Sequence, residues 1–158
     1  MLKQCFIFLF FLSVLTVPGF SQNSNSNINF QQVDEFARTV RYNGDLQELT
    51  NTLTTPYADS MYKLRAIFIW IADNIEYDYK LFNSGSNEWN RFECYGSRET
   101  CAQARLDWNN KHLEHVLNKK KTVCNGYTKL FKRMCNMAGI QNEMVDGYVK
   151  KTPFQIGL

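Results

Sequence analysis

The sequence predicts a mostly helical chain with one or two strands late in the sequence. In two stretches, 61–74 and 127–138, apolar residues recur at the spacing of a buried helical face. In a third, 140–150, the apolar residues Met144, Val145, Tyr148 and Val149 predict a strand. The helices therefore precede the expected strand.

Residues 1–21 have the pattern of a secretory signal peptide. Lys3 precedes an apolar stretch from Cys5 to Val17, and the small residues Gly19 and Ser21 lie just before Gln22. The apolar stretch is too short to span a bilayer, which takes about 20 apolar residues. We therefore expect cleavage between Ser21 and Gln22, export to the periplasm or the medium, and no transmembrane anchor.

The cleaved chain is expected to form one domain with a modest core. Removing 21 of the 158 residues leaves 137, a length that suits a single domain. Removing Lys3 also lowers the formal net charge from +3 to +2. So small a charge argues against nucleic acid or an anionic membrane as the partner.

The segment before the main domain is expected to consist of a polar spacer and two short helices. Residues 22–29 form a polar spacer with little to bury. Residues 30–55 then predict two short amphipathic helices, at 30–40 and from Leu46 to Leu53. The second ends before Pro56, because the residue that precedes a proline avoids helical conformation. These helices are expected to cover the core.

Residues 56–158 are expected to form the main domain, which starts with a central helix. Asp59 or Ser60 can cap a helix over 61–74, and that helix is apolar nearly all round. Tyr77 and Asp78 follow it, and packing or capping is favoured for them over orienting backbone near a site. Further along, 107–117 predicts another helix.

Cys124 lies at the start of the helix over 127–138, in its first turn or just before it. Gly139 is expected to end that helix, since glycine adopts the left-handed cap conformation readily. Free N–H groups and the helix dipole favour a thiolate over a thiol at such a position. Gly126 is expected to let a substrate approach the sulfur. The alternative is a buried structural cysteine.

Two stretches resemble the transglutaminase-like superfamily. KKKTVCNGYTKLFKRMCNMAGI (119–140), followed by VDGYVK (145–150), is similar to the segment that carries the nucleophile of that family. KLRAIFIWIADNIEYD (63–78) is similar to its core helix. The resemblance covers residues 46–150 and implies an α+β, papain-like fold, of which this chain carries mainly the helical first half. It also implies that Cys124 is the catalytic residue.

The activity implied by the resemblance is acyl transfer on amide bonds of a protein or peptide substrate. The thiolate attacks the carbonyl carbon and forms a thioester, which water hydrolyses or an amine converts into a cross-link. Backbone N–H groups around Cys124 are expected to hold the oxyanion. No cofactor is expected.

The base and acid that the family places after the cysteine are not found through Leu158. The two histidines, His112 and His115, precede Cys124 and match no family motif. We expect that the reading frame continues beyond Leu158 and that the domain is incomplete there, so that the intact protein is an enzyme and these 158 residues alone are inactive. The alternative is a catalytically inactive binding or scaffold module. A thiol-disulfide oxidoreductase is disfavoured, because the chain has no C-x-x-C pair.

The remaining cysteines are assigned from their spacing. Cys94 and Cys101 in an exported protein are compatible with a local disulfide, and two free thiols are the alternative. With His112 and His115 they have the spacing C-x6-C-x10-H-x2-H, which structural zinc sites do not favour. No metal is therefore expected, and the two histidines are interpreted as surface residues. Cys135 is interpreted as a core residue.

Overall fold

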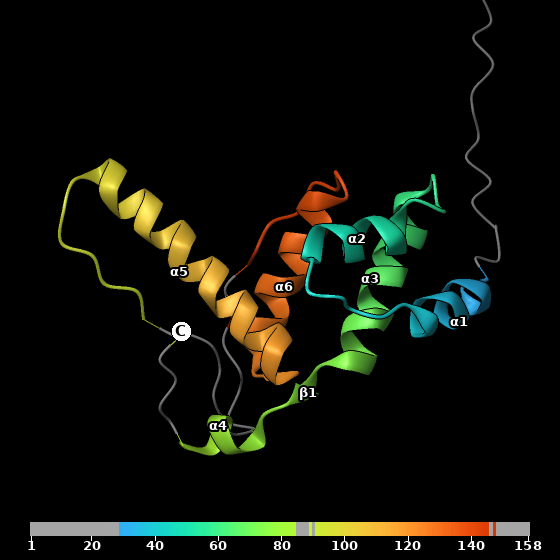
Figure 1. The fold of residues 1–158 in the computed structure, drawn as a ribbon, viewed down its shortest axis with the longest axis horizontal. Helices are drawn as coiled ribbons and strands as arrows, with labels where there is room; N and C mark the ends of the chain where they lie inside the picture. Colours follow the sequence, from blue (N-terminus) through green and yellow to red (C-terminus); the bar gives the residue numbers. More distant parts are fainter. Residues whose placement is uncertain (1–28, 85–88, 90, 146, 148–158) are drawn as a thin grey trace, which may run out of the picture.

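The computed structural model describes residues 29–84, 89, 91–145 and 147. The expected signal peptide and nearly all of the polar spacer lie outside this range. The described helices and strands, in chain order (Figure 1), are α1 (Gln31–Thr39), α2 (Leu46–Thr54), α3 (Ser60–Asn74), β1 (Glu76–Tyr77), α4 (Tyr79–Ser84), α5 (Arg98–Lys119), β2 (Lys121–Thr122) and α6 (Cys124–Met137).

The described part of the chain is mostly helical with one small parallel sheet, as an α+β fragment should be. Glu76 pairs with Lys121, and Tyr77 pairs with Thr122. The pairing continues on either side, because the Glu76 N–H donates to the Lys120 carbonyl at 2.8 Å and the Asp78 N–H donates to the Thr122 carbonyl at 2.9 Å. The sheet thereby ties the end of α3 to the start of α6.

The strand expected at 140–150 is not formed by the residues of that stretch that the structure describes. Residues 140–145 and 147 are neither helix nor strand, and the rest of the stretch lies outside the described residues. A strand needs a partner for its backbone N–H and C=O groups. The described strands β1 and β2 pair only with each other. Residues 140–145 therefore have no described strand as a hydrogen-bonding partner.

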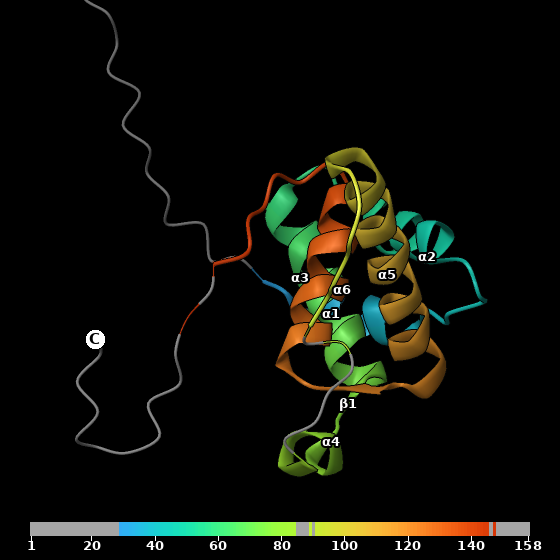
Figure 2. The ribbon, with the colours of Figure 1, turned by 90° about the vertical axis from the view of Figure 1, so that its left-hand side faces the viewer.

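The core lies around α3, which packs against α1, α2 and α6. Ala66, Ile67 and Trp70 of α3 are buried against residues that include Leu53 and Leu130, and the Trp70 indole N–H donates to the Val40 carbonyl at 3.2 Å. Figure 2 shows α6 between α3 and α5. The central position expected for α3 is confirmed, although Met61 and Phe68 on its outer side are exposed.

The helix boundaries agree with the sequence where a cap or a glycine marks them. Asp59 caps α3, since its carboxylate accepts from the Met61 N–H at 2.7 Å. Gly139 has a φ of +73° just after α6, as expected. The helix predicted over 107–117 is longer than expected, because α5 already starts at Arg98 with Ser97 as its cap. The short helix α4 was not expected.

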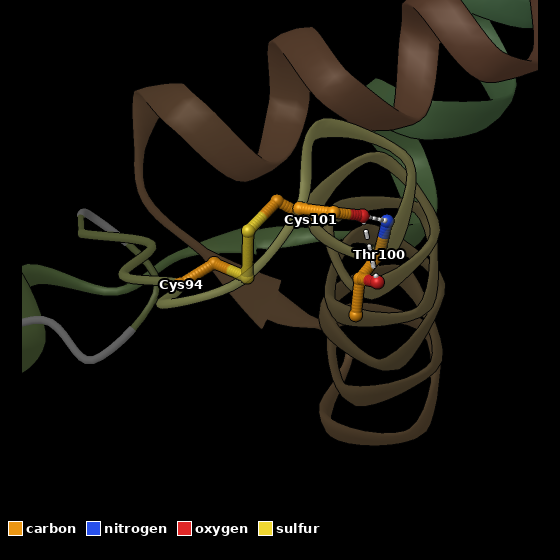
Figure 3. The surroundings of a disulfide bond; sticks show 4 residues. Cys94, Thr100 and Cys101 are labelled. Carbon is orange, nitrogen blue, oxygen red and sulfur yellow. Dashed lines mark hydrogen bonds between the residues drawn. A yellow bond between two sulfur atoms is a disulfide. The ribbon is translucent and has the colours of Figure 1, made fainter.

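The disulfide considered from the sequence is present. Cys94 and Cys101 are bonded to each other (Figure 3), with their Cα atoms 5.7 Å apart. The bond joins the segment before α5 to the first turn of that helix, where Ser97 accepts from the Thr100 N–H. It also occupies two of the four candidate zinc ligands. Among the described helices, none combines the length and the apolar character needed to cross a membrane.

Candidate functional site

Cys124 is the first residue of α6, and the parallel strand pair holds it there. β2 ends at Thr122, and Val123 then serves as the N-cap residue with an extended backbone and no side-chain hydrogen bond to the helix. Since β2 is paired with β1, the start of α6 is fixed relative to the end of α3. The placement of Cys124 in the first turn is therefore confirmed.

Two backbone donors are free at this helix start. The N–H groups of Gly126 and Tyr127 both donate to the Val123 carbonyl, at 2.9 and 3.3 Å. The N–H groups of Cys124 and Asn125 have no acceptor among the described residues. Unpaired donors at the positive end of a helix suit a negatively charged oxygen. The site thus has the kind of donors that an oxyanion needs.

The two free cysteines of the described chain lie in different environments. Cys124 is exposed, whereas Cys135 is fully buried on the inner side of α6. The Cys124 thiol makes no hydrogen bond with another described residue, while its backbone carbonyl accepts from the Thr128 hydroxyl at 2.9 Å. Burial raises the pKa of the Cys135 thiol. Cys135 is a core residue, as predicted, and Cys124 is open to a reagent or substrate.

Gly126 has a different role from the one expected. It is buried, and a Cβ atom at this position would collide with the side-chain hydroxyl of Thr122 and lie 2.8 Å from its Cβ. Thr122 is itself buried. The missing side chain therefore makes room for Thr122 of β2, and the space beside Gly126 is not an opening for a substrate.

Two tyrosines connect the start of α6 to the end of α3 through a hydrogen bond and a ring contact. The Tyr127 hydroxyl donates to the Ile75 carbonyl at 2.7 Å, and its ring stacks on that of Tyr77 with the centroids 6.3 Å apart. Burial raises the pKa of Tyr127, and the neighbouring Tyr77 and Glu76 raise it further. Asp78 accepts from the Leu81 N–H at the start of α4. The packing and capping roles favoured for Tyr77 and Asp78 are confirmed.

His112 is buried, which corrects the surface position expected for it. Only 2% of it is exposed, because the ring of Trp89 stacks on it at a centroid distance of 4.8 Å. Burial, together with the positive charges of Lys129 and His115, lowers the pKa of His112 to about 4. The imidazole is therefore neutral at pH 7, and its Nδ1 lies 3.4 Å from the Lys129 ammonium.

Neither histidine forms a hydrogen bond with the Cys124 thiol in the described structure. His112 and His115 line a cavity of about 240 Å³ together with Asp78 and Lys121, and Cys124 does not line it. Sequence reasoning missed the burial of His112, because Trp89 comes from a stretch without helical or strand periodicity. The described residues thus supply an accessible thiol and backbone donors, and they bring no imidazole to the thiol.

The comparisons with known proteins agree with this geometry. The family model of the Transglutaminase-like superfamily matches residues 46–155. The kyphoscoliosis peptidases of Mus musculus and Homo sapiens are each 32% identical to the chain over 128 residues. That region is 81% of this chain and 16% of each relative, so the chain spans about one sixth of their length. No solved structure matches the chain. The family match runs from α2 through α6 and includes Cys124, and the chain belongs to the transglutaminase-like superfamily.

Proposed function

We propose that the protein transfers acyl groups from amide bonds, with Cys124 as the nucleophile. The observation that carries the proposal is the exposed thiol at the first residue of α6, in a domain of this superfamily. The thiol gives up its proton to water and the thiolate adds to an amide carbonyl carbon. The C–N bond then breaks as the leaving amine takes a proton from water. The product is a thioester on the Cys124 sulfur.

The free N–H groups of Cys124 and Asn125 support the first step. They lie beside the nucleophile and can donate to the oxygen that becomes negative in the tetrahedral intermediate. Because the backbone of an N-terminal turn is rigid, these donors need little rearrangement as charge develops.

Hydrolysis is the favoured fate of the thioester. Water releases the acyl group as a carboxylic acid, whereas an amine would form a new amide and cross-link two chains. The relatives from mouse and human carry the name peptidase, which favours water as the acceptor here. A protein or peptide is accordingly the proposed substrate.

We also propose that the protein acts outside the cytoplasm. The signal-like pattern of residues 1–21 predicts export, and the Cys94–Cys101 disulfide suits an oxidising compartment. The tagged chain should appear in the periplasm or medium without residues 1–21. N-terminal sequencing of the exported form would identify Gln22 as its first residue. An uncleaved chain in the cytoplasm would contradict the export proposal.

An inactive binding module is the second candidate function. It is favoured by one observation, that no described histidine contacts the Cys124 thiol. Such a module would keep the fold and recognise a partner without forming a thioester. The two candidates differ in whether an acyl group ever becomes attached to Cys124.

The test compares the protein expressed from its whole reading frame with its Cys124→Ser and Cys135→Ala variants, because the described residues bring no imidazole to the thiol. Each is incubated with unfolded casein and a fluorescent primary amine, then quenched in acid. New peptides and amine incorporation are measured, and mass spectrometry locates any acyl group on the chain. The wild type and Cys135→Ala should cleave casein and carry a thioester at Cys124, whereas Cys124→Ser should do neither.

Two results would overturn the proposal. Activity that survives in Cys124→Ser would place the chemistry elsewhere. A folded wild type with neither cleavage, amine incorporation nor a thioester would favour the binding module. Cys135→Ala controls for the loss of a sulfur atom, because Cys135 is buried and remote from the helix start.

A further inference from the structure

A cationic groove lies between α5 and α6, apart from the start of α6. Both helices run side by side (Figures 1 and 2). Each contributes residues at the spacing i, i+3, i+4, i+7, which lie on one face of a helix. The groove has a volume of about 260 Å³, and its walls are Leu106, Asn109, Asn110, Leu113, Lys129, Lys132, Arg133, Asn136 and Met144.

The two walls differ in chemistry. The wall from α6 carries three cations, Lys129, Lys132 and Arg133, and the wall from α5 carries leucines and neutral amides. No acidic side chain of the described residues lines the groove. Positive charge is thus concentrated next to apolar surface, while Asp107 and Glu114 line a neighbouring cavity that Arg133 also lines.

The arginine at the centre of the groove has a neutral hydrogen-bond partner and no ion pair among the described residues. Its guanidinium donates through Nη2 to the side-chain oxygen of Asn110, which is a neutral partner. The Nε atom of Arg133 is buried and has no acceptor among the described residues. No described carboxylate forms an ion pair with Arg133 or with Lys132.

Lys129 adds charge at one end of the groove. Its ammonium lies 4.1 Å from the ring centroid of Trp108 and 3.4 Å from Nδ1 of His112. Burial lowers the pKa of Lys129, and the positive charge of Arg105 lowers it further. The effect of Arg105 indicates a local excess of positive charge, which a bound anion would relieve.

We propose that this groove binds an acidic peptide segment of a partner protein. A glutamate or aspartate carboxylate pairs with Lys132 and Arg133, and an adjacent apolar side chain packs on Leu106, Leu113 and Met144. Carboxylates form their strongest hydrogen bonds with charged donors of this kind. The apolar wall favours a peptide over a free anion, because only the peptide also buries hydrocarbon.

The size of the groove is in keeping with that occupant. At about 260 Å³ it is slightly smaller than a typical site for a drug-sized molecule, and it suits the side chains of a short segment. The nearest groove residue on α6, Lys129, follows Cys124 by five residues. Binding in the groove therefore needs no chemistry at the thiol and does not depend on the proposed function.

The experiment measures peptide binding to the full chain carrying Cys124→Ser, so that catalytic failure cannot affect the result. The probe is a fluorescein-labelled peptide of sequence GLEELG, and GLQQLG is its neutral counterpart. Fluorescence anisotropy is recorded at low and moderate ionic strength. Lys132→Gln and Asn136→Asp alter the groove, and Lys63→Gln on α3 removes the same charge far from it in the sequence.

We expect GLEELG to bind saturably and GLQQLG to bind at least tenfold more weakly. Lys132→Gln and Asn136→Asp should each weaken binding at least fivefold, and Lys63→Gln should change it less than twofold. Binding should also weaken with added salt, as it does for exposed charges. Circular dichroism checks folding, and Asn136→Asp keeps the test valid if Lys132→Gln fails to fold.

Three outcomes would overturn the proposal. Equal binding of both peptides would exclude a carboxylate site. If Lys132→Gln and Lys63→Gln weakened the binding of GLEELG equally, the binding would depend on the net charge of the protein and not on the groove. Displacement of GLEELG by an equal concentration of inorganic phosphate would identify a general anion site in place of a peptide groove.

Discussion

At the scale of single residues, the absence of one side chain positions the start of α6. Gly126 has no Cβ, and the Thr122 side chain occupies the space that a Cβ would need. β2 can therefore lie directly against the first turn of the helix that begins with Cys124. A motif glycine beside a nucleophile invites a functional interpretation, yet its role here is packing within the protein.

Gly126→Ala should destabilise the protein by about 1–3 kcal/mol, the usual cost of overpacking a filled site. Alanine favours helices by about 1 kcal/mol relative to glycine, so a site with free space would instead gain stability. Urea denaturation followed by circular dichroism measures the change. The double variant Gly126→Ala/Thr122→Gly removes the collision and should lose less than the sum of the two single losses. A more stable Gly126→Ala protein would contradict the close contact with Thr122.

At the scale of the elements, helix starts are set by local hydrogen bonds that the sequence only partly reveals. Asp59 and Ser60 are both good capping residues, and their sequence left the choice between them open. In the structure the Asp59 carboxylate accepts from the Met61 N–H, and Ser60 is the first helical residue. The two residues therefore offer a matched pair for measuring the cap of α3.

Asp59→Ala should lower the free energy of unfolding by about 1 kcal/mol, because it leaves a backbone donor of α3 without its acceptor. Ser60→Ala should change stability by only a few tenths of a kcal/mol, since alanine is a good helix former and the serine hydroxyl does not cap the helix. Thermal and urea unfolding of both variants compare the two losses. A larger loss in Ser60→Ala would mean that the cap is one residue later.

The predictable elements are those with a long apolar period and a recognisable end. The helices α1, α2, α3 and α6 meet this condition, and Gly139 and Pro56 mark two of their ends. β1 and β2 have two residues each, too few for an alternating pattern. Their pairing joins residues 45 positions apart in the chain, and nothing local in the sequence encodes it.

The same reasoning explains which parts of the candidate site were predictable. The position of Cys124 follows from the period of the helix behind it. The burial of His112 depends on Trp89 and Trp108 gathering over it, and Trp89 lies outside any periodic segment. The role of Gly126 depends on Thr122, which approaches only because β2 pairs with β1. Local patterns predict helices, whereas these contacts arise between elements.

At the scale of the whole molecule, the paired strands fix the start of α6, where Cys124 lies, relative to the buried helix α3. α3 is buried among α1, α2 and α6, and β1 follows it within two residues. β2 precedes α6 by a single residue, so Cys124 lies directly after the strand that is paired with the end of α3. The side of α3 that carries Met61 and Phe68 stays exposed. α5 covers the side of α6 that faces away from α3 (Figure 2).

The buried His112 should make the stability of the whole molecule depend on pH. In the unfolded chain the histidine takes up a proton below about pH 6.5. In the folded chain burial, Lys129 and His115 delay protonation until about pH 4. Between these values the unfolded state binds more protons, so stability is complete above pH 6.5 and falls as the pH drops toward 4. The contribution of His112 to this loss is about 3 kcal/mol.

Urea denaturation at a series of pH values from 4 to 7.5 tests this dependence. His112→Gln removes the titrating group, and its stability should decline less steeply than that of the wild type below pH 6.5. His115→Gln is the comparison variant, because His115 lies one helical turn away on the same helix, is exposed, and is the smallest of the three causes that lower the pKa of His112. Its decline should remain close to that of the wild type. Parallel curves for the wild type and His112→Gln would mean that His112 takes up its proton as readily in the folded protein as in the unfolded chain. The stacking of Trp89 over His112 would then not exclude water.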